Sequence, residues 1–287
     1  MVGKKGLGVK NVHGLGCRLR HWLSAWGLVA DGASVETPRG LLLPVIVEAE
    51  QRCAMLKVSA DASERAGMRL LRAWAGRGAV RVFRQEDDAL LMARGSASLL
   101  DEPCDDRACA VLCDVIGRLH DHSVDPRGYV PLAVWFQALL EAPETSGAVI
   151  MAGRHVAFEL LAASSPSGVL HGDLHHGNVL WFGPTSGWSA IDPKGLVGPL
   201  AFDYVPMFLN PDLADPGRST ARDAASLDRR LALVEARAGR SRDELLRWVL
   251  AYACLSALWS RADGQGDGVA LSVADLAARR LGLVRTR

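Results

Sequence analysis

Short apolar runs separated by turn residues occupy residues 26–60 of the chain. The apolar runs are 27–29, 41–43 and 53–58, and the turn signals between them are 31–32 and 37–40. Runs of this length, bounded by glycine, proline and aspartate, predict strands. Pro44 directly follows the second run. Because proline has no backbone N–H, it favours an edge strand or a bulge at that position.

The pattern then changes to a predicted helix and a predicted hairpin. Asp61 and Glu64 have the spacing of a capping box at a helix start. The apolar face of this helix comprises Leu70, Leu71 and Trp74, and the pattern ends at Gly76 and Gly78. Apolar residues 79–83 and 89–93 then flank the charged residues 85–88, as the two strands of a hairpin flank its turn.

From about residue 104 the pattern is mostly helical. The predicted helices cover residues 105–121, 131–141, 147–163, 222–238, 242–260 and 272–282. Ser241 with Glu244 marks the start of one of them, and Ser272 with Asp275 marks the start of the last.

Two β-rich segments, 169–182 and 188–192, interrupt the helical region. The chain therefore has a smaller sheet-rich part followed by a larger, mainly helical part. We expect an α+β fold, with one lobe at residues 1–94 and a second lobe at residues 95–287.

Composition and charge exclude several classes of partner. The chain has 287 residues, a hydrophobic fraction of 49% and a formal net charge of +1, and its basic residues are scattered. No basic patch typical of a nucleic-acid-binding protein is present, and no window approaches 18 uninterrupted apolar residues, as a membrane span requires. No apolar run follows Lys4 and Lys5, so no signal peptide is expected. We therefore expect a cytoplasmic protein without nucleic-acid or membrane partners.

The most informative stretch is VLHGDLHHGNVL, residues 169–180. His171, Asp173 and Asn178 have the H-x-D-x-x-x-x-N spacing of a kinase catalytic loop. A second apolar strand ends at Asp192, and if the two strands pair as a hairpin, Asn178 and Asp192 meet at its open end. Phosphoryl transfer needs such a set. One carboxylate receives the hydroxyl proton, while an amide oxygen and a second carboxylate hold Mg²⁺ against the phosphates.

Two upstream residues complete this set. Lys57 lies within an apolar strand, where a lysine is costly unless it meets negative charge. ATP phosphates and a glutamate on the next helix, Glu64, would provide that charge. The five residues occur in the order that kinases use.

These stretches resemble the aminoglycoside/hydroxyurea phosphotransferase family, particularly its streptomycin 6-kinase branch. The resemblance is carried by HGDLHHGN, IDPKGLVGP, AFDYVPMFLNP and AYACLSALW, and by HWLSAWGLVADG near the start. It extends from about residue 20 to residue 262 and is strongest over residues 169–211. The fold that it implies is the bilobal protein-kinase-like fold, with ATP bound in the cleft.

The resemblance also implies roles for individual residues. Asp173 would be the catalytic base or the carboxylate that orients the hydroxyl. Asn178 and Asp192 would bind Mg²⁺, and Lys57 would hold the α- and β-phosphates of ATP. The remaining assignments are Glu64, which would fix Lys57, and Asp203, which would be structural behind the catalytic loop.

The chain departs from protein kinases at three points. It has no G-x-G-x-x-G loop, and the candidate cover for the phosphates is residues 36–41, with Gly40 as its glycine. Gly172 replaces the arginine of protein kinases, and residues 192–194, Asp-Pro-Lys, stand where Asp-Phe-Gly would be. Both replacements suit an antibiotic kinase and argue against activation by phosphorylation, because that switch needs an arginine to pair with the phosphate.

Simpler interpretations of single residues stay open. The histidines of the loop admit a zinc site, although its glycines indicate a loop and no H-E-x-x-H is present. We expect His171 to support the loop by hydrogen bonding instead. Lys57 alone is also compatible with an edge-strand lysine, and Glu64 alone with the third helical residue of a capping box.

The sequence therefore predicts an ATP-dependent enzyme that phosphorylates a hydroxyl group of a small molecule. From the resemblance, the expected acceptor is a streptomycin-like aminoglycoside, whose modification gives resistance. A kinase for hydroxyurea or for a metabolite alcohol is the first alternative, because the same scaffold serves all of them. A nucleotide-binding pseudokinase is the second, and the intact set of Lys57, Asp173, Asn178 and Asp192 argues against it.

Overall fold

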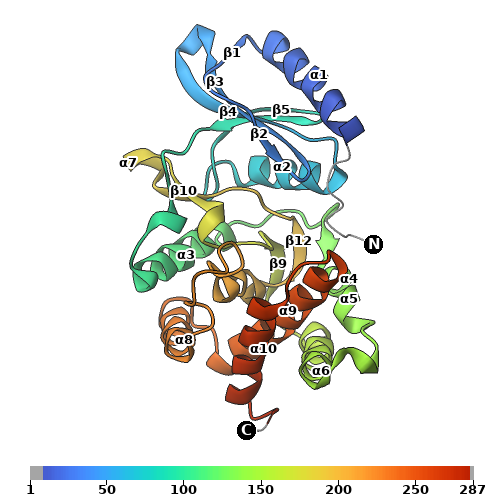
Figure 1. Cartoon of the computed structure of the whole chain (residues 1–287). Helices are drawn as coiled ribbons and strands as arrows, with labels where there is room; N and C mark the ends of the chain where they lie inside the picture. Colours follow the sequence, from blue (N-terminus) through green and yellow to red (C-terminus); the bar gives the residue numbers. More distant parts are fainter. Residues whose placement is uncertain (1–8, 285–287) are drawn as a thin grey trace.

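Six strands of the N-terminal part form one antiparallel sheet in the computed structural model, which describes residues 9–284 (Figure 1). The strands are β1 (Leu28–Ala30), β2 (Val35–Thr37), β3 (Gly40–Val47), β4 (Arg52–Val58), β5 (Val82–Glu86) and β6 (Ala89–Ala93). Their order is β1-β3-β4-β6-β5, with β2 paired to β3. The predicted strands and hairpin are present, although β5 begins at Val82, and Ala79 instead pairs with Ala190.

Two helices pack on this sheet, α1 (Val9–Ala25), which the sequence pattern had not indicated, and α2 (Ala62–Trp74). Side chains alternate between the two faces along a strand. In β4, Leu56 and Val58 belong to the same hydrophobic cluster as Trp22 of α1. Lys57 therefore points to the opposite face, toward α2 and the C-terminal part.

Pro44 lies inside β3, and the prediction of an edge strand or a bulge there is wrong. β3 has neighbours on both sides, since β4 pairs with it from Leu41 to Val47 while β2 and β1 share its other side. The Pro44 carbonyl accepts a hydrogen bond from the Asp31 backbone N–H at 2.8 Å. A strand residue directs its N–H and C=O to the same side. The hydrogen bond that Pro44 cannot donate is therefore missing on the side of β1, and the hydrogen bonds between β3 and β4 are unaffected.

The C-terminal part is mainly helical. Its helices are α3 (Asp105–His120), α4 (Leu132–Trp135), α5 (Gln137–Leu140), α6 (Ala148–Ala162), α7 (Gly183–Ser186), α8 (Ala224–Ala238), α9 (Arg242–Ala262) and α10 (Gly268–Arg280). Its strands are β7 (Ala97–Ser98), β8 (Val130–Pro131), β9 (Ser167–Leu170), β10 (Val179–Trp181), β11 (Trp188–Ala190) and β12 (Leu196–Pro199), in two small sheets ordered β11-β10-β7 and β8-β12-β9. Short 3₁₀ helices lie at Glu48–Glu50, Leu99–Asp101, Glu144–Ser146, His176–Asn178, Leu200–Tyr204 and Pro206–Leu209.

The helices of this part pack around α9. This helix is buried from Leu245 to Ala257 almost without interruption, and it packs against α6, α8 and α10. In Figure 1, α6, α8 and α10 lie at the end of the molecule remote from the large sheet, and the two small sheets lie between them and that sheet. The predicted organisation, a sheet-rich N-terminal part and a helical C-terminal part, is confirmed.

Two predicted helices differ from the structure. The segment 131–141 forms two short helices, α4 and α5, which meet at Phe136. That side chain is fully buried against the rings of Phe202 and Trp248, so packing decides the local backbone. The last helix begins at Gly268, four residues before the expected cap, and the Ser272 hydroxyl donates to the Gly268 carbonyl inside the helix at 2.7 Å.

Among residues 9–284, no helix combines the length and apolar character needed to cross a membrane. Lys4 and Lys5, on which the expectation about a signal peptide was based, lie outside the described residues.

Candidate active site

The H-x-D-x-x-x-x-N loop connects β9 to β10, so it leaves one small sheet and enters the other. His171, its first residue, is fully buried and joins the start of the loop to the residue that follows β11. Its Nε2 is 2.9 Å from the Ile191 carbonyl oxygen, and its Nδ1 accepts from the Asp173 backbone N–H at 3.3 Å. Burial lowers the pKa of His171 and favours the neutral ring that these bonds need. The predicted supporting role of His171 is confirmed.

Asp203 fixes the same loop by accepting hydrogen bonds from its backbone. Its side chain is completely buried and accepts hydrogen bonds from the backbone N–H groups of His171 at 3.0 Å and Gly172 at 2.8 Å. His120, at the end of α3, approaches the same carboxylate with Nε2 at 2.9 Å. Burial alone would raise the pKa of Asp203, but the bond from His120 and the backbone donors outweigh it and lower this pKa. A buried carboxylate thus replaces water as the partner of two loop N–H groups.

The hairpin predicted after the loop exists and brings Asn178 beside Asp192. β10 pairs antiparallel with β11, with Val179 opposite Ala190, and the Ile191 N–H donates to the Asn178 carbonyl at 2.9 Å. The Asn178 side-chain nitrogen donates to the Asp173 backbone carbonyl at 2.8 Å. This bond uses the nitrogen of the amide, and it orients the oxygen, the atom that ligates a metal ion.

Lys57 lies between two carboxylates. Its Nζ is 2.5 Å from Oε2 of Glu64 on α2 and also pairs with Oδ1 of Asp192. Burial alone would lower the pKa of Lys57, but the Asp192 and Glu64 carboxylates outweigh it and raise this pKa. β4 is a central strand, so the edge-strand interpretation of Lys57 is wrong.

The capping interpretation of Glu64 is also incomplete. Asp61 is indeed the N-cap of α2 and accepts from the backbone N–H groups of Ser63 and Glu64. In a capping box the Glu64 side chain would return to the N-cap backbone. Its carboxylate instead forms the ion pair with Lys57, and its side chain is only 11% exposed.

α2 lies directly on the segment that follows Asp192. A Cβ atom at Gly67 would be 2.3 Å from the Pro193 carbonyl oxygen, so only glycine permits this approach. Gly67 stands one turn after Glu64. Asp192 itself has a φ of 59°, in the left-handed region, which costs a non-glycine residue roughly 1–2 kcal/mol. Contacts on both sides of Asp192 therefore fix an otherwise unfavourable conformation.

Lys194 connects the two aspartates of the site. Its Nζ lies 3.1 Å from Oδ2 of Asp173 and 3.7 Å from Oδ2 of Asp192. Burial alone would lower the pKa of Lys194, but the two carboxylates outweigh it and raise this pKa. With Lys57 on its other oxygen, Asp192 has a lowered pKa despite its burial. Both lysines and Asp192 are therefore charged at neutral pH.

Gly40 is the first residue of β3 and lies beside the tip of the β2–β3 hairpin, which was expected to cover the phosphates. β3 pairs with β4 so that Leu42 is opposite Lys57. A Cβ atom at Gly40 would be 2.6 Å from the Val58 carbonyl oxygen, which requires glycine. The hairpin tip is fixed to the start of α2, since Arg39 donates to the Ser63 hydroxyl at 2.8 Å. The hairpin therefore lies next to Lys57.

The zinc interpretation of the loop histidines finds little support. His171 is used in the loop bonds, and His175 accepts from the Gly177 N–H through Nδ1. Among residues 9–284, the group of possible metal ligands that includes a loop histidine is Asp105, Cys109 and His176, whose atoms lie within 4.8 Å of one another.

In that group, Arg230 already occupies both carboxylate oxygens of Asp105, at 2.9 and 2.6 Å. A cation there would face the buried guanidinium, which is only 1% exposed. Burial lowers the pKa of His176 to about 3, which indicates a neutral core side chain.

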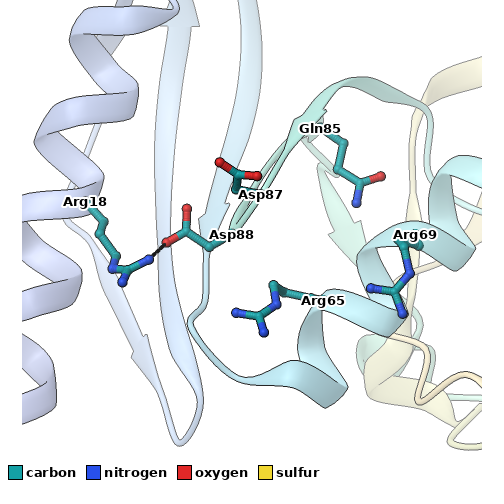
Figure 2. Close-up of a pocket in the computed structure, with 6 residues that line it drawn as sticks. All are labelled: Arg18, Arg65, Arg69, Gln85, Asp87 and Asp88. Atoms are coloured by element: carbon teal, nitrogen blue, oxygen red, sulfur yellow. Dashed lines mark hydrogen bonds and ion pairs between the residues drawn. The ribbon is translucent and has the colours of Figure 1, made fainter. Parts of the chain in front are cut away.

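A surface cavity of about 560 Å³ lies elsewhere on the N-terminal part (Figure 2). Arg65 and Arg69 of α2 line it, together with the β5–β6 hairpin and Arg18 of α1, which pairs with Asp88. None of the predicted site residues lines this cavity.

The residues around Lys57 suit a nucleotide with a divalent metal ion. Oxygen donors from Asn178 and Asp192 are the hard ligands that Mg²⁺ prefers, and Lys57 supplies positive charge for phosphates. Asp173, Asn178, Asp192, Lys57 and Glu64 were all predicted from the sequence, and the structure brings them together. Lys194 and His120 were not singled out. Lys194 was visible as the third residue of Asp-Pro-Lys, whereas nothing in the sequence marked His120.

Comparison with known proteins agrees with this geometry. The family model described as "Aminoglycoside/hydroxyurea antibiotic resistance kinase" matches residues 25–264. The chain is 44% identical to streptomycin 3''-kinase of Klebsiella pneumoniae, over 90% of this chain and 99% of that protein. It is 32% identical to streptomycin 6-kinase of Streptomyces glaucescens, over 88% of this chain and 85% of that protein.

Solved structures show the same fold at lower identity. Aminoglycoside phosphotransferase APH(4)-Ia is 14% identical, has a TM-score of 0.61, and is matched over 94% of this chain and 99% of that chain. The fold is therefore the predicted protein-kinase-like fold of small-molecule kinases. With the family model spanning most of the described residues, the chain belongs to the aminoglycoside/hydroxyurea antibiotic resistance kinases.

Proposed function

We propose that this chain transfers the γ-phosphoryl group of ATP to a hydroxyl group of a streptomycin-like aminoglycoside and so inactivates the antibiotic. The observation that carries the proposal is the convergence of Lys57, Asp192 and Asp173. Lys57 and Asp192 are 135 positions apart in the sequence, yet they form an ion pair, and Lys194 joins Asp192 to Asp173. Such a set provides charge for phosphates beside a carboxylate that can orient an alcohol.

Each residue has a defined task in this proposal. Asp173 orients the acceptor hydroxyl and takes its proton, and Lys57, fixed by Glu64, holds the phosphates of the nucleotide. Gly40 lets the β2–β3 hairpin approach them closely. Asn178 and Asp192 hold Mg²⁺, which neutralises phosphate charge when it is bound. Positioning and charge neutralisation, rather than covalent chemistry of the protein, then supply the catalysis.

The acceptor class is supported by the relatives. A protein 44% identical over nearly its whole length is named for phosphorylating streptomycin at the 3'' position, and another that is 32% identical is named for the 6 position. The higher sequence identity favours the 3''-hydroxyl over the 6-hydroxyl that the sequence motifs had suggested.

We further propose that the two lobes comprise residues 1–94 and 95–287. We also propose a cytoplasmic location, where ATP is available to the enzyme.

Incubation of the purified chain with ATP, Mg²⁺ and streptomycin tests the proposal. We expect one phosphate per antibiotic by mass spectrometry, and fragmentation identifies the hydroxyl. Asp173→Asn keeps the size of the side chain but removes its basicity, and should lower kcat by about 10²- to 10⁴-fold while nucleotide binding persists.

The matched control for this test is Asp114→Asn. Asp114 has a side chain that is 63% exposed on α3, so this change should leave kcat intact. Full activity of Asp173→Asn would contradict the assigned role. Absence of a phosphorylated product from streptomycin and other aminoglycosides would contradict the acceptor class. Hydroxyurea would then be the next acceptor to test, because the family description includes it.

A further inference from the structure

Lys194 lies between the two aspartates of the site but has no task of its own in the proposed reaction so far. It follows Asp192 by two residues, and its Nζ lies 3.1 Å from Asp173 and 3.7 Å from Asp192. The side chain is 22% exposed, so most of it is buried. Its location is fixed by the backbone, since the Lys194 N–H donates to the His171 carbonyl at 2.7 Å.

The two carboxylates that Lys194 contacts mark the two ends of the proposed transfer. In the proposed function, Asp173 would orient the acceptor hydroxyl, and Asp192 would hold the metal ion that neutralises the phosphates of the donor. In phosphoryl transfer the attacking and leaving oxygens are in line, and charge develops on the three equatorial oxygens between them. A cation that lies close to both carboxylates would therefore lie near those equatorial oxygens.

Charge also favours this placement. Two lysines, Lys57 and Lys194, are surrounded by three carboxylates, those of Glu64, Asp173 and Asp192. Lys57 is engaged by Glu64 on the side of α2. Lys194 is the cation directed toward Asp173, where the phosphoryl group must pass. A buried lysine is costly unless it meets negative charge, and the transferring group brings more of it.

We propose that Lys194 is a further catalytic residue, which binds the γ-phosphoryl group and stabilises the charge that develops on it during transfer. This inference rests on the proposed function. In the reaction, the acceptor oxygen forms a bond to the γ-phosphorus, and the bond from that phosphorus to the oxygen bridging to the β-phosphorus breaks. The electron pair of the broken bond leaves with ADP, and the hydroxyl proton passes to Asp173. Lys194 stays protonated throughout.

The proposal makes a prediction that separates Lys194 from Lys57. A residue that binds the γ-phosphate should distinguish ATP from ADP, whereas a residue that only positions the aspartates should not. For Lys194→Met we expect the affinity for the β,γ-imido analogue of ATP to fall at least 10-fold in the presence of Mg²⁺. Affinity for ADP with Mg²⁺ should change less than threefold, and kcat should fall about 100-fold, as for loss of one preorganised donor.

Isothermal titration calorimetry with both nucleotides, together with steady-state kinetics with streptomycin, measures these effects. Lys194→Arg keeps the charge and should restore most of the preference for the ATP analogue over ADP. The matched control is Arg279→Met, because Arg279 is a cation with a side chain that is 41% exposed on α10. This control should leave both affinities and kcat unchanged. Thermal unfolding of each variant verifies that the fold is intact.

Equal weakening of ATP analogue and ADP by Lys194→Met, or a kcat within threefold of the wild type, would overturn the inference and leave the proposed function standing. If the wild-type chain phosphorylates no aminoglycoside, the acceptor class fails instead. The comparison of ATP analogue with ADP still decides the role of Lys194 in that case, because it needs no acceptor.

Discussion

Asp203 provides a quantitative test of how the catalytic loop is fixed. The change Asp203→Asn keeps the size of a completely buried side chain but turns one acceptor oxygen into a donor. The carboxylate accepts from the backbone N–H groups of His171 at 3.0 Å and Gly172 at 2.8 Å, and from His120 at 2.9 Å. An asparagine has one acceptor atom, so at least one backbone donor loses its partner inside the protein.

The magnitude follows from these contacts. A hydrogen bond to a charged group contributes about 1.5–3 kcal/mol, and an unsatisfied buried donor costs a further 1–3 kcal/mol or so. We therefore expect Asp203→Asn to lower the free energy of unfolding by about 3 kcal/mol. At roughly 2–4 °C per kcal/mol for a protein of this size, Tm should fall by about 6–12 °C. Because the loop carries Asp173, kcat should fall as well, by about 10- to 100-fold.

Urea denaturation monitored by circular dichroism measures the free energy, and calorimetry measures Tm. The control is Asp114→Asn, which changes an exposed ion pair with Arg237 and should alter stability by less than about 0.5 kcal/mol. If Asp203→Asn unfolds at the same urea concentration as the wild type, the buried carboxylate does not hold the loop, and our reasoning about its hydrogen bonds is wrong.

Three further predictions concern Gly67, Lys57 and the pH dependence of Asp203. Gly67→Ala should lower both nucleotide affinity and kcat at least 10-fold, because its Cβ would lie 2.3 Å from the Pro193 carbonyl oxygen and would displace α2 together with Glu64. Calorimetry measures the affinity and steady-state kinetics measure kcat. An unchanged affinity would contradict the close contact. Lys57→Met should weaken binding of ADP and of the ATP analogue to a similar extent, by at least about 10-fold, and a selective loss of one nucleotide would argue against contact with the α- and β-phosphates. The pKa of Asp203 is lowered in the folded protein, because the bond from His120 and the backbone N–H groups outweigh burial. Its stabilisation is therefore complete above the unfolded-state pKa of about 4 and is lost as the pH falls through the lower native pKa. The stability difference between wild type and Asp203→Asn should shrink when urea titrations are repeated below pH 4, and a constant difference would refute the linkage.

Local patterns in the sequence were sufficient for the elements that carry the site. The period of two along β4 directs Lys57 away from Leu56 and Val58. The hairpin of β10 and β11 places Asn178 beside Asp192, and the five-residue step from Asp173 to Asn178 sets the loop. These relations hold within single elements or neighbouring strands, where backbone geometry and hydrophobic periodicity leave few alternatives.

Contacts between distant elements were decided by the tertiary structure. Glu64 fits a capping box equally well in the sequence, and only the packing of α2 against β4 makes it the partner of Lys57. Three further features also depend on which surfaces meet: the presence of α1, the division of segment 131–141, and the bond between His120 and Asp203. Propensity is a weak preference that tertiary contacts override.

The Asp-Pro-Lys segment shows both contributions. The sequence pattern indicates that Asp192 ends a strand, and the predicted hairpin makes it a candidate metal ligand beside Asn178. The side chain of Lys194 reaches Asp173 because the chain turns through a left-handed residue at Asp192, φ 59°, and rests on Gly67 of α2. That turn is unfavourable in isolation. It is stabilised by the ion pair of Asp192 with Lys57 of β4 and by the close approach of Gly67 of α2 to Pro193, and both partners lie more than 100 residues earlier in the chain. The sequence therefore identified the polar groups of the proposed site except Lys194 and His120, and the tertiary structure alone decided which of them meet.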